Sequence, residues 1–209
     1  MLRYAITDRA RLPGDEGQRQ AGLLNQVERL AAGGIDFLQL REKDLEAGAL
    51  AHMGRRLLGV LRELDPVPKL LINSRADVAV AIAADGVHLT SAPGSLTPAE
   101  VRRLYASAGL REPVVSVSCH TLSEVAAARE SEASLILFGP VFEKRAGSEL
   151  VAEGTGLEVL HDACMAAAPV PVLALGGITT ENAPACSEAG AAGVAAIRLF
   201  QKEPALWRI

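Results

Sequence analysis

Aromatic side chains are scarce in this sequence. They make up 3% of its 209 residues, whereas hydrophobic residues of all kinds reach 49%, so the core has to be built mainly from Ala, Val, Leu and Ile. Aliphatic residues of this kind are typical of buried parallel strands and of the helices that cover them. The sequence therefore favours an α/β protein, and no linker or change in composition divides residues 1–209 into more than one domain.

An excess of positive charge is also absent. The net charge is −4 with a pI near 5.6, and no basic cluster with interleaved aromatics is present. Cys119, Cys164 and Cys186 form an odd, unpatterned set, which is typical of proteins from a reducing compartment. No apolar run is long enough to cross a bilayer, and the first residues do not resemble a signal peptide. We therefore expect a cytoplasmic protein whose partners include neither nucleic acid nor a membrane.

Short apolar runs alternate with longer amphipathic stretches along the chain. Repeated strand–helix units with right-handed crossovers give a parallel sheet with helices outside it. Eight units predict closure into a single (β/α)₈ TIM barrel with short loops, since such barrels typically have about 250 residues; an open doubly wound sheet is the alternative. The predicted strands are Tyr4–Thr7, Ile35–Arg41, Lys69–Asn73, Gly86–Leu89, Val114–Ser118, Ser134–Phe138, Val170–Leu175 and Gly193–Ile197.

Helical patterns fill the gaps between these strands. Three of them begin with the spacing of a capping box, in which a hydroxyl and an acid satisfy backbone amides reciprocally: Ser74 with Asp77, Thr97 with Glu100, and Thr121 with Glu124. The predicted helices are Gln18–Ala32, Leu45–Leu64, Arg75–Ala83, Pro98–Ala106, Leu122–Glu132, Leu157–Ala167, Glu181–Ala189 and a short Pro204–Arg208.

Polar residues follow the second predicted strand, where a barrel places its ligand site. Gln39 and Arg41 share one face of this strand because side chains alternate, and Lys43 joins them if the extended path continues. An amide, a guanidinium and an ammonium together suit a phosphate or a pyrophosphate. The alternative is an ordinary strand end whose cations pair with Glu42 and Asp44.

The loops after the seventh and eighth strands are the usual phosphate site of a barrel. Gly176 and Gly177 follow the seventh strand, and their N–H groups can approach an anion closely; a plain tight turn is the alternative. The eighth strand ends at Ile197 and Arg198, whose guanidinium could add a positive charge.

His120 follows the fifth strand and could move a proton at the mouth of a barrel, or else merely pack beside the next helix. His88 lies within the fourth strand, where a structural role is expected. His52 and His161 fall on helices and are expected at the surface.

A long polar connection, residues 143–156, follows the sixth strand. Long loops of this kind are often lids or ligand loops, and Lys144 or Arg145 could close over a phosphate. A disordered surface loop is the alternative.

Eight short motifs occur in order along nearly the whole chain. Together they resemble the thiamine-phosphate synthase and thiazole tautomerase (TenI-like) family, whose fold is a (β/α)₈ barrel. The motifs are Tyr4-Ala-Ile-Thr-Asp8, Gln39-Leu-Arg-Glu-Lys43, Asn73-Ser-Arg-Ala-Asp77, Asp85-Gly-Val-His-Leu89, Ser118-Cys-His-Thr121, Phe138-Gly-Pro-Val-Phe142, Ala174-Leu-Gly-Gly-Ile178 and Ala189-Gly-Ala-Ala-Gly-Val194.

The resemblance implies roles for individual residues. His120 matches the histidine proposed as the acid/base of the tautomerase. The matches to the pyrimidine-diphosphate contacts of the synthase are Gln39, Arg41, Lys43 and Asn73, with Ser118 as a further ligand contact. The thiazole phosphate would lie at Gly177, Ile197 and Arg198, although Arg198 replaces a usual Ser.

Both carboxylates that hold Mg²⁺ in the synthase pattern are missing. The family carries an Asp directly after the Asn of the third strand, where this sequence has Ser74. It carries another Asp in a Gly-Gln-x-Asp pattern after the fourth strand, where this sequence reads Thr90-Ser-Ala-Pro93. Because Mg²⁺ usually takes one or two carboxylates beside substrate phosphates, the departures favour an activity that needs no metal.

The sequence thus predicts an isomerase of thiamin biosynthesis, a thiazole phosphate tautomerase without a cofactor. One alternative is thiamine-phosphate synthase, a transferase that couples hydroxymethylpyrimidine diphosphate to thiazole phosphate with Mg²⁺ and releases pyrophosphate. A non-catalytic barrel that binds a phosphorylated ligand is the third hypothesis. The expected partners are a small phosphorylated thiazole, a pyrimidine diphosphate for the synthase, and a second copy of the chain in a homo-oligomer.

Overall fold

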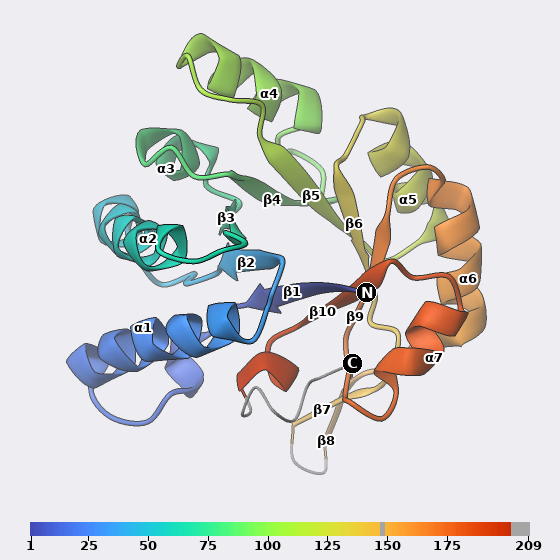
Figure 1. Cartoon of the computed structure of the whole chain (residues 1–209). Coiled ribbons are helices and arrows are strands. Elements are labelled where there is room, and N and C mark those ends of the chain that lie inside the picture. Colours follow the sequence, from blue (N-terminus) through green and yellow to red (C-terminus); the bar gives the residue numbers. More distant parts are fainter. Residues whose placement is uncertain (147–148, 202–209) are drawn as a thin grey trace.

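Eight parallel strands close into a barrel, as the sequence predicts, and an open sheet is excluded (Figure 1). The computed structural model describes residues 1–146 and 149–201. Side chains are described for these residues except those of 144–151. The strand order around the barrel is β1-β10-β9-β6-β5-β4-β3-β2. The strands are β1 Leu2–Ile6, β2 Phe37–Leu40, β3 Lys69–Asn73, β4 Gly86–Thr90, β5 Val114–Cys119, β6 Leu135–Phe138, β9 Val172–Leu175 and β10 Gly193–Ala196.

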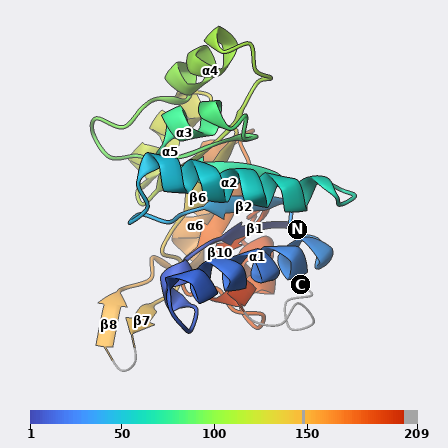
Figure 2. The same cartoon turned by 90° about the vertical axis from the view of Figure 1, so that its left-hand side faces the viewer.

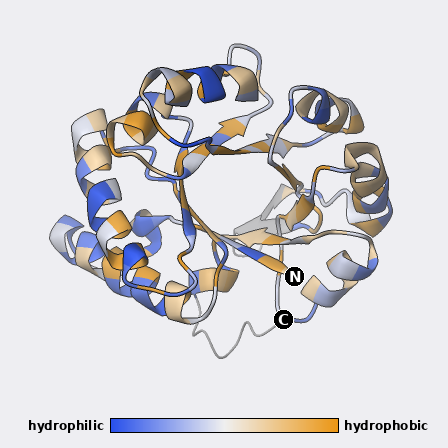
Figure 3. Cartoon of the chain, turned by 45° about the horizontal axis from the view of Figure 1, so that its top comes forward, coloured by the Kyte–Doolittle hydropathy of each residue, from blue (hydrophilic) through white to orange (hydrophobic). Residues whose placement is uncertain are grey.

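Helices surround the barrel as an outer layer, visible as a ring around the strands in Figure 3. Each predicted helix before residue 190 is present with ends shifted by a few residues, while the predicted helix 204–208 lies outside the described residues. No helix in the described ranges is long and apolar enough to span a membrane. The helices are η1 Arg9–Arg11, α1 Glu16–Ala32, α2 Ala47–Arg62, α3 Ala76–Ala81, α4 Pro98–Ser107, α5 Leu122–Glu130, α6 Gly156–Ala167, α7 Ala183–Glu188 and η2 Leu199–Gln201.

Capping boxes begin three of the helices. The predicted boxes at Thr97 and Thr121 are confirmed, because each side chain accepts from the third backbone N–H of its helix and Glu at that position bonds back. A third box, at Asp15, begins α1 and was not predicted. In each case the reciprocal bonds satisfy two amides that have no partner within the helix.

The capping box predicted at Ser74 is wrong. Arg75 precedes α3 as its N-cap residue and makes no side-chain cap bond. Asp77 instead pairs with the guanidinium of Arg75, at 2.6 Å between Oδ2 and Nη2. Ser74 has a φ of +55°, a conformation that turns the chain sharply after β3 and leaves the Ser74 hydroxyl outside the cap.

The connection after β6 contains an antiparallel hairpin that the sequence reading treated as a loop. Strands β7, Lys144–Ala146, and β8, Glu149–Ala152, pair with each other and not with the barrel. In Figure 2 the hairpin projects beyond the end of the barrel opposite the N-terminus, which is the end where the parallel strands finish. The segment therefore extends from the mouth of the barrel, where ligands of this fold bind.

Alternation along the strands divides the core into two parts. Residues facing the barrel axis form one small cluster, which includes Tyr4, Ile6, Leu71, Leu137 and Leu173. The residues between them face outward and pack against the helices in a much larger cluster. Because the interior is narrow, the identity of each inward residue decides what the mouth can bind.

Candidate active site at the mouth of the barrel

A cavity of about 480 Å³ opens at the carboxyl ends of the strands. All the site residues predicted from the sequence line it, with two exceptions: the side chains of Lys144 and Arg145 lie outside the described residues. His88, Ser74, Thr90 and Glu143 also line the cavity, and were not predicted as ligand contacts. The predicted residues that the cavity brings together are Gln39, Arg41, Lys43, Asn73, Ser118, His120, Gly176, Gly177, Ile197 and Arg198.

The wall of the cavity is polar on one side and apolar on the other. Strand register places Asn73 beside His88 and Thr90 beside Ser118, so β3, β4 and β5 supply a continuous polar surface, which Gln39 extends on β2. The strands on the opposite side supply the apolar surface: Ile6, Leu137, Leu175 and Ile197. A cavity of this size with such a division suits a flat ring that carries polar groups on one edge.

Gln39 and Asn73 form a pair of amides on adjacent strands. Nε2 of Gln39 donates to Oδ1 of Asn73 at 2.9 Å. The Gln39 side chain is 1% exposed, yet its Oε1 has no hydrogen-bond partner in the described structure. A buried carbonyl oxygen without a donor is costly, and Oε1 can accept a hydrogen bond from an N–H group of a ligand in the cavity.

The alternative interpretation of the β2–α2 loop required its cations to pair with their acidic neighbours, and they do not. Among the described residues, neither the Arg41 guanidinium nor the Lys43 ammonium has a hydrogen bond or an ion pair. Glu42 and Asp44 instead bind Arg9, with Nη1–Oε2 and Nη2–Oδ2 distances of 2.9 and 2.7 Å. The two positive charges therefore remain available at the cavity.

A buried network fixes this loop from below. Arg9 is 3% exposed and Glu42 5% exposed. Glu42 also accepts from the Thr7 hydroxyl at 2.6 Å, and that same hydroxyl oxygen accepts from the backbone N–H of Arg41 at 2.9 Å. Thr7, Arg9 and Glu42 were not predicted as functional. The signal in the sequence was Glu42, an acid between the two cations at the end of the strand. Its partner Arg9 lies more than thirty residues away, so the pair could not be identified from neighbouring residues.

Gly176 and Gly177 have φ values of +94° and +66°, a left-handed conformation that favours glycine. A Cβ on Gly177 would lie 2.7 Å from Cβ of Phe142 and 2.8 Å from the Glu143 carbonyl oxygen. The glycines therefore allow the loop after β6 to pack against the loop after β9. The N–H groups of Gly177 and Ile178 have no acceptor among the described residues, so an anion can still bind there.

His120 is exposed at the mouth, and its ring is held in one orientation. Nδ1 lies 2.5 Å from the carbonyl oxygen of Gly139. Since a carbonyl oxygen can only accept, Nδ1 carries a proton, and Nε2 is the ring atom left to exchange a proton with a ligand. Its backbone N–H donates to the Glu124 carboxylate, which fixes the residue at the start of α5.

His88 is 4% exposed and bonds through both ring nitrogens, to Ser116 and to Ser118, each at 2.8 Å. Burial, and then the positive charge of Arg41, lower the pKa of His88 to about 3. The ring is therefore neutral at physiological pH, in keeping with the structural role predicted for it. His52 and His161 are exposed on helices, as predicted.

Cys119, next to His120 in sequence, faces away from the cavity into the outer core and is fully buried. Burial raises the pKa of its thiol to about 12. Because a thiol reacts as its thiolate, Cys119 is unreactive at neutral pH.

The described residues do not fit a Mg²⁺ ion held by protein carboxylates. Glu143 is the one Asp or Glu that lines the described cavity, and no cluster of three metal-ligating side chains occurs among the side chains that the structure describes. Ser74 replaces one Asp of the family pattern, and Thr90 begins the segment that replaces the other. Both line the cavity and offer only hydroxyls. Positive charge at this mouth comes from Arg41, Lys43 and Arg198 instead.

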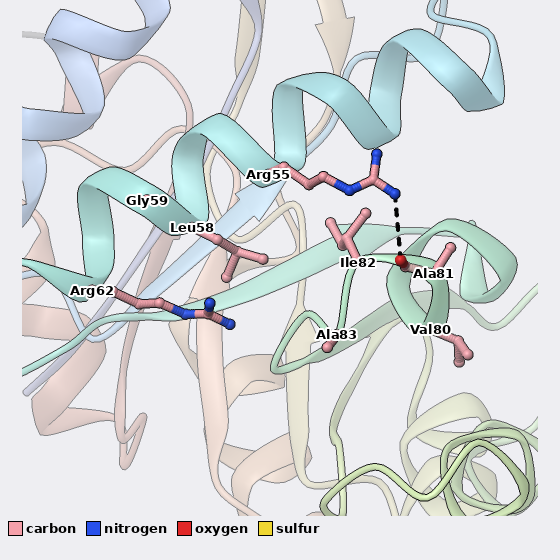
Figure 4. A pocket seen from close by; sticks show the side chains of 8 residues that line it. All are labelled: Arg55, Leu58, Gly59, Arg62, Val80, Ala81, Ile82 and Ala83. Carbon is pink, nitrogen blue, oxygen red and sulfur yellow. Dashed lines mark hydrogen bonds between the residues drawn. The ribbon is translucent and has the colours of Figure 1, made fainter.

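A second depression of about 380 Å³ lies on the outer wall between α2 and α3 (Figure 4). Arg55 and Arg62 border it, and Arg55 donates to the Ala81 carbonyl. The depression lies beside the C-terminal halves of these helices, which run back toward the end of the barrel away from the mouth. It contains none of the predicted site residues.

The fold and the cavity define a (β/α)₈ barrel with an anion-binding, half-apolar site at its mouth. A family model described as thiamine monophosphate synthase (TMP-TENI) matches residues 3–200. The chain belongs to this family, and its fold and sequence are those of a thiamine-phosphate-synthase-like protein of thiamin biosynthesis. The resemblance inferred from eight motifs is thereby confirmed.

Individual relatives are similar over most of their length. A putative thiamine-phosphate synthase of Geobacter sulfurreducens is 38% identical over 201 residues, which cover 96% of this chain and 87% of the relative. A thiamine-phosphate synthase of Azorhizobium caulinodans is 33% identical, with the same coverage. The solved thiamine phosphate pyrophosphorylase from Pyrococcus furiosus superimposes with a TM-score of 0.79 at 26% identity, covering 99% of this chain and 93% of that chain.

Proposed function

We propose that this protein is a thiamine-phosphate synthase, a transferase that couples a pyrimidine diphosphate to a thiazole phosphate. Sequence analysis preferred the tautomerase, mainly because two acids are missing. The names of the relatives support the synthase instead. The observation that carries the proposal is that Arg41 and Lys43, which have no ion-pair partner among the described residues, line the cavity together with a buried amide pair. A tautomerase acting on a monophosphate has no evident need for this second anion site.

The diphosphate would bind at the β2–α2 loop. A diphosphate carries several negative charges, and a guanidinium and an ammonium side by side can neutralise part of them. The buried Arg9–Glu42 pair holds the loop, so Arg41 and Lys43 are positioned before the substrate arrives. Charge placed in advance stabilises a leaving group most effectively because no reorganisation is needed during the reaction.

The pyrimidine would bind against the amide pair. Its exocyclic amine is a donor and the neighbouring ring nitrogen is an acceptor. Oε1 of Gln39 lacks a donor, and Nδ2 of Asn73 has no acceptor among the described residues. The two amides therefore present the complementary acceptor and donor, in the way that amide side chains recognise adenine edges in DNA.

The thiazole phosphate would occupy the opposite side of the mouth. Its phosphate would bind the N–H groups at Gly177 and Ile178, with Arg198 adding positive charge. Its ring would lie against the apolar wall formed by Leu175 and Ile197. The thiazole nitrogen would then form a bond to the methylene carbon of the pyrimidine while the bond from that carbon to the diphosphate oxygen breaks. The leaving pyrophosphate keeps the electron pair, beside Arg41 and Lys43.

The test is coupling of pyrimidine diphosphate to thiazole phosphate by purified protein, followed by pyrophosphate release with and without added Mg²⁺. Turnover is expected, and it should be lost in an Arg41→Ala/Lys43→Ala variant but kept in Arg56→Ala, an exposed arginine on the outer face of α2. No coupling under either metal condition would contradict the proposal. Thiazole phosphate binding without turnover of any substrate would then identify a non-catalytic barrel.

The tautomerase is the second candidate, and the geometry of His120 favours it. Because Nδ1 donates to Gly139, Nε2 is the ring atom at the mouth that can exchange a proton with a ligand, and the coupling reaction has no obvious need for such a group. In this hypothesis Nε2 takes a proton from one ring carbon of a carboxylated thiazole phosphate and returns it at another. Loss of isomerisation in His120→Asn with ligand binding retained would support this candidate, and full activity in that variant would exclude it.

A further inference from the structure

A chain of four hydrogen-bonding side chains crosses the interior of the barrel. The Tyr4 hydroxyl on β1 lies 3.0 Å from Oγ of Ser116 on β5, the strand opposite β1 in the closed barrel. Ser116 contacts Nδ1 of His88, and Nε2 of His88 contacts Ser118, both at 2.8 Å. Tyr4 and Ser116 are fully buried, whereas Ser118 lines the cavity. The chain therefore connects the interior to the ligand site.

Neutral His88 has one N–H donor and one lone-pair acceptor, so the chain can run in only two directions. In one, each group donates toward the cavity, from Tyr4 to Ser118. In the other, each group donates toward Tyr4. The two directions place opposite groups at the cavity: Ser118 offers its proton in the first case and only a lone pair in the second.

The buried end of the chain decides between them. Ser116 is the sole hydrogen-bond partner of the Tyr4 hydroxyl in the described structure. If Ser116 donated to Tyr4, the phenol proton would be buried without an acceptor, which is strongly unfavourable. Tyr4 therefore donates to Ser116. Among the described residues the Ser116 proton then has one acceptor left, Nδ1 of His88.

We propose that Tyr4, Ser116 and His88 are positioning residues for Ser118. Tyr4 and Ser116 hold His88 as its Nε2–H tautomer, so that Ser118 accepts from His88 and donates its own proton into the cavity. The proton of Ser118 then requires a hydrogen-bond acceptor on the substrate, such as an anionic oxygen or a ring nitrogen. The identity of the substrate rests on the function proposed above. The direction of the hydrogen bonds from Tyr4 to Ser118 does not rest on that function.

The first test is ¹⁵N NMR of the histidine-labelled wild-type protein. Only 4 histidines are present, and the His88 signals are assigned from their loss in His88→Gln. The expected spectrum shows an unprotonated Nδ1 and a protonated Nε2, unchanged across the neutral pH range because the ring does not titrate there. A protonated Nδ1 would overturn the proposal, whatever reaction the protein catalyses.

The second test compares Ser116→Ala with Ser134→Ala. Ser116→Ala removes the donor to Nδ1, so the second tautomer should become populated, and KM for the substrate bound by Ser118 should rise about tenfold while kcat changes less. Ser134 accepts a hydrogen bond from the Val115 N–H and takes no part in the hydrogen bonds between Tyr4 and Ser118. Ser134→Ala should therefore leave both the His88 tautomer and KM unchanged. An unaltered His88 spectrum in Ser116→Ala would contradict the proposal. Because the spectrum needs no turnover, absence of coupling activity would count against the proposed function alone.

Discussion

At the scale of single residues, the ligand site is marked by polar groups that lack protein partners. Within the described part of the chain, Oε1 of Gln39 is buried without a donor, and Arg41 and Lys43 form no ion pair although Glu42 and Asp44 are their sequence neighbours. Folded proteins satisfy nearly all their buried polar groups, so such exceptions call for an explanation. The diphosphate and the aminopyrimidine ring of the proposed substrate would provide one.

The cation pair leads to a first prediction. Arg41→Ala should lower kcat for coupling by about 100-fold, the effect of removing one preorganised donor to a developing negative charge. Arg41→Lys should recover only part of this loss because an ammonium cannot form the two parallel bonds of a guanidinium. Steady-state kinetics of the three proteins measures the effect. Wild-type kcat in Arg41→Ala would show that Arg41 is not near the leaving group.

At the scale of elements, the β2–α2 loop depends on a contact from η1. Arg9 links Glu16 on α1 with Glu42 and Asp44, so the first two βα loops are fixed to each other. Breaking a buried pair by removing one partner leaves the other charge unpaired. The position of the cations is therefore a property of two loops that are far apart in sequence.

The second prediction tests this contact. Glu42→Gln should reduce the free energy of unfolding by about 3 kcal/mol because the nearly buried Arg9 loses the one partner of its ion pairs that is itself buried. Urea denaturation measures the change. Asp44→Asn, at a carboxylate that is 68% exposed, should have a much smaller effect. Equal losses in the two variants would contradict the assignment of Glu42 as the central partner.

The contact between the β6 and β9 loops gives a third prediction. Gly177→Ala places a methyl group within 3 Å of the Phe142–Glu143 backbone at a φ of +66°, so both a clash and a left-handed conformation oppose it. Gly109→Ala is the matched control, since Gly109 has a φ of +67° and open space around its Cβ position. The control should lose about 1 kcal/mol, and Gly177→Ala clearly more, in urea denaturation. Similar losses would mean that the loops do not require the close approach.

At the scale of the whole molecule, carboxylates bonded to arginines make stability depend on pH. The Arg9 guanidinium holds the pKa of Asp44 below its usual value of 3.8, and the Arg75 guanidinium does the same for the pKa of Asp77. A folded-state pKa below the unfolded one means that the unfolded chain binds more protons. This stabilisation is complete above pH 3.8 and is lost as the pH falls through the folded-state values.

The fourth prediction follows from the sign of this shift. Arg75→Gln should unfold at a lower urea concentration than the wild type near neutral pH, and the difference should shrink as the pH falls well below 3.8, where Asp77 is protonated in both proteins. Arg56→Gln, whose side chain is exposed on α2, serves as the control. A difference that stays constant into strong acid would show that Asp77 does not contribute in this way.

The barrel and most of its mouth were predictable because they follow from local periodicity. Strands ending near Gln39, Asn73 and Ser118 place those side chains at one end of the barrel once the eight units are counted. The hairpin at β7 and β8 was missed because its short strands lack apolar alternation. The false capping box at Ser74 had the right spacing, but only the backbone conformation shows that the cap is not formed.

The sequence by itself determined the family, the closed barrel and the residues at its mouth, because strand period, helix period and motif order are all properties of neighbouring residues. Only the tertiary structure decided which charges remain available and which way the interior bonds run. Arg9 pairs with Glu42 and Asp44, which are the sequence neighbours of Arg41 and Lys43. Tyr4 forms a hydrogen bond across the barrel with Ser116. Partner choice between distant side chains depends on folded distances and burial, which no local pattern encodes.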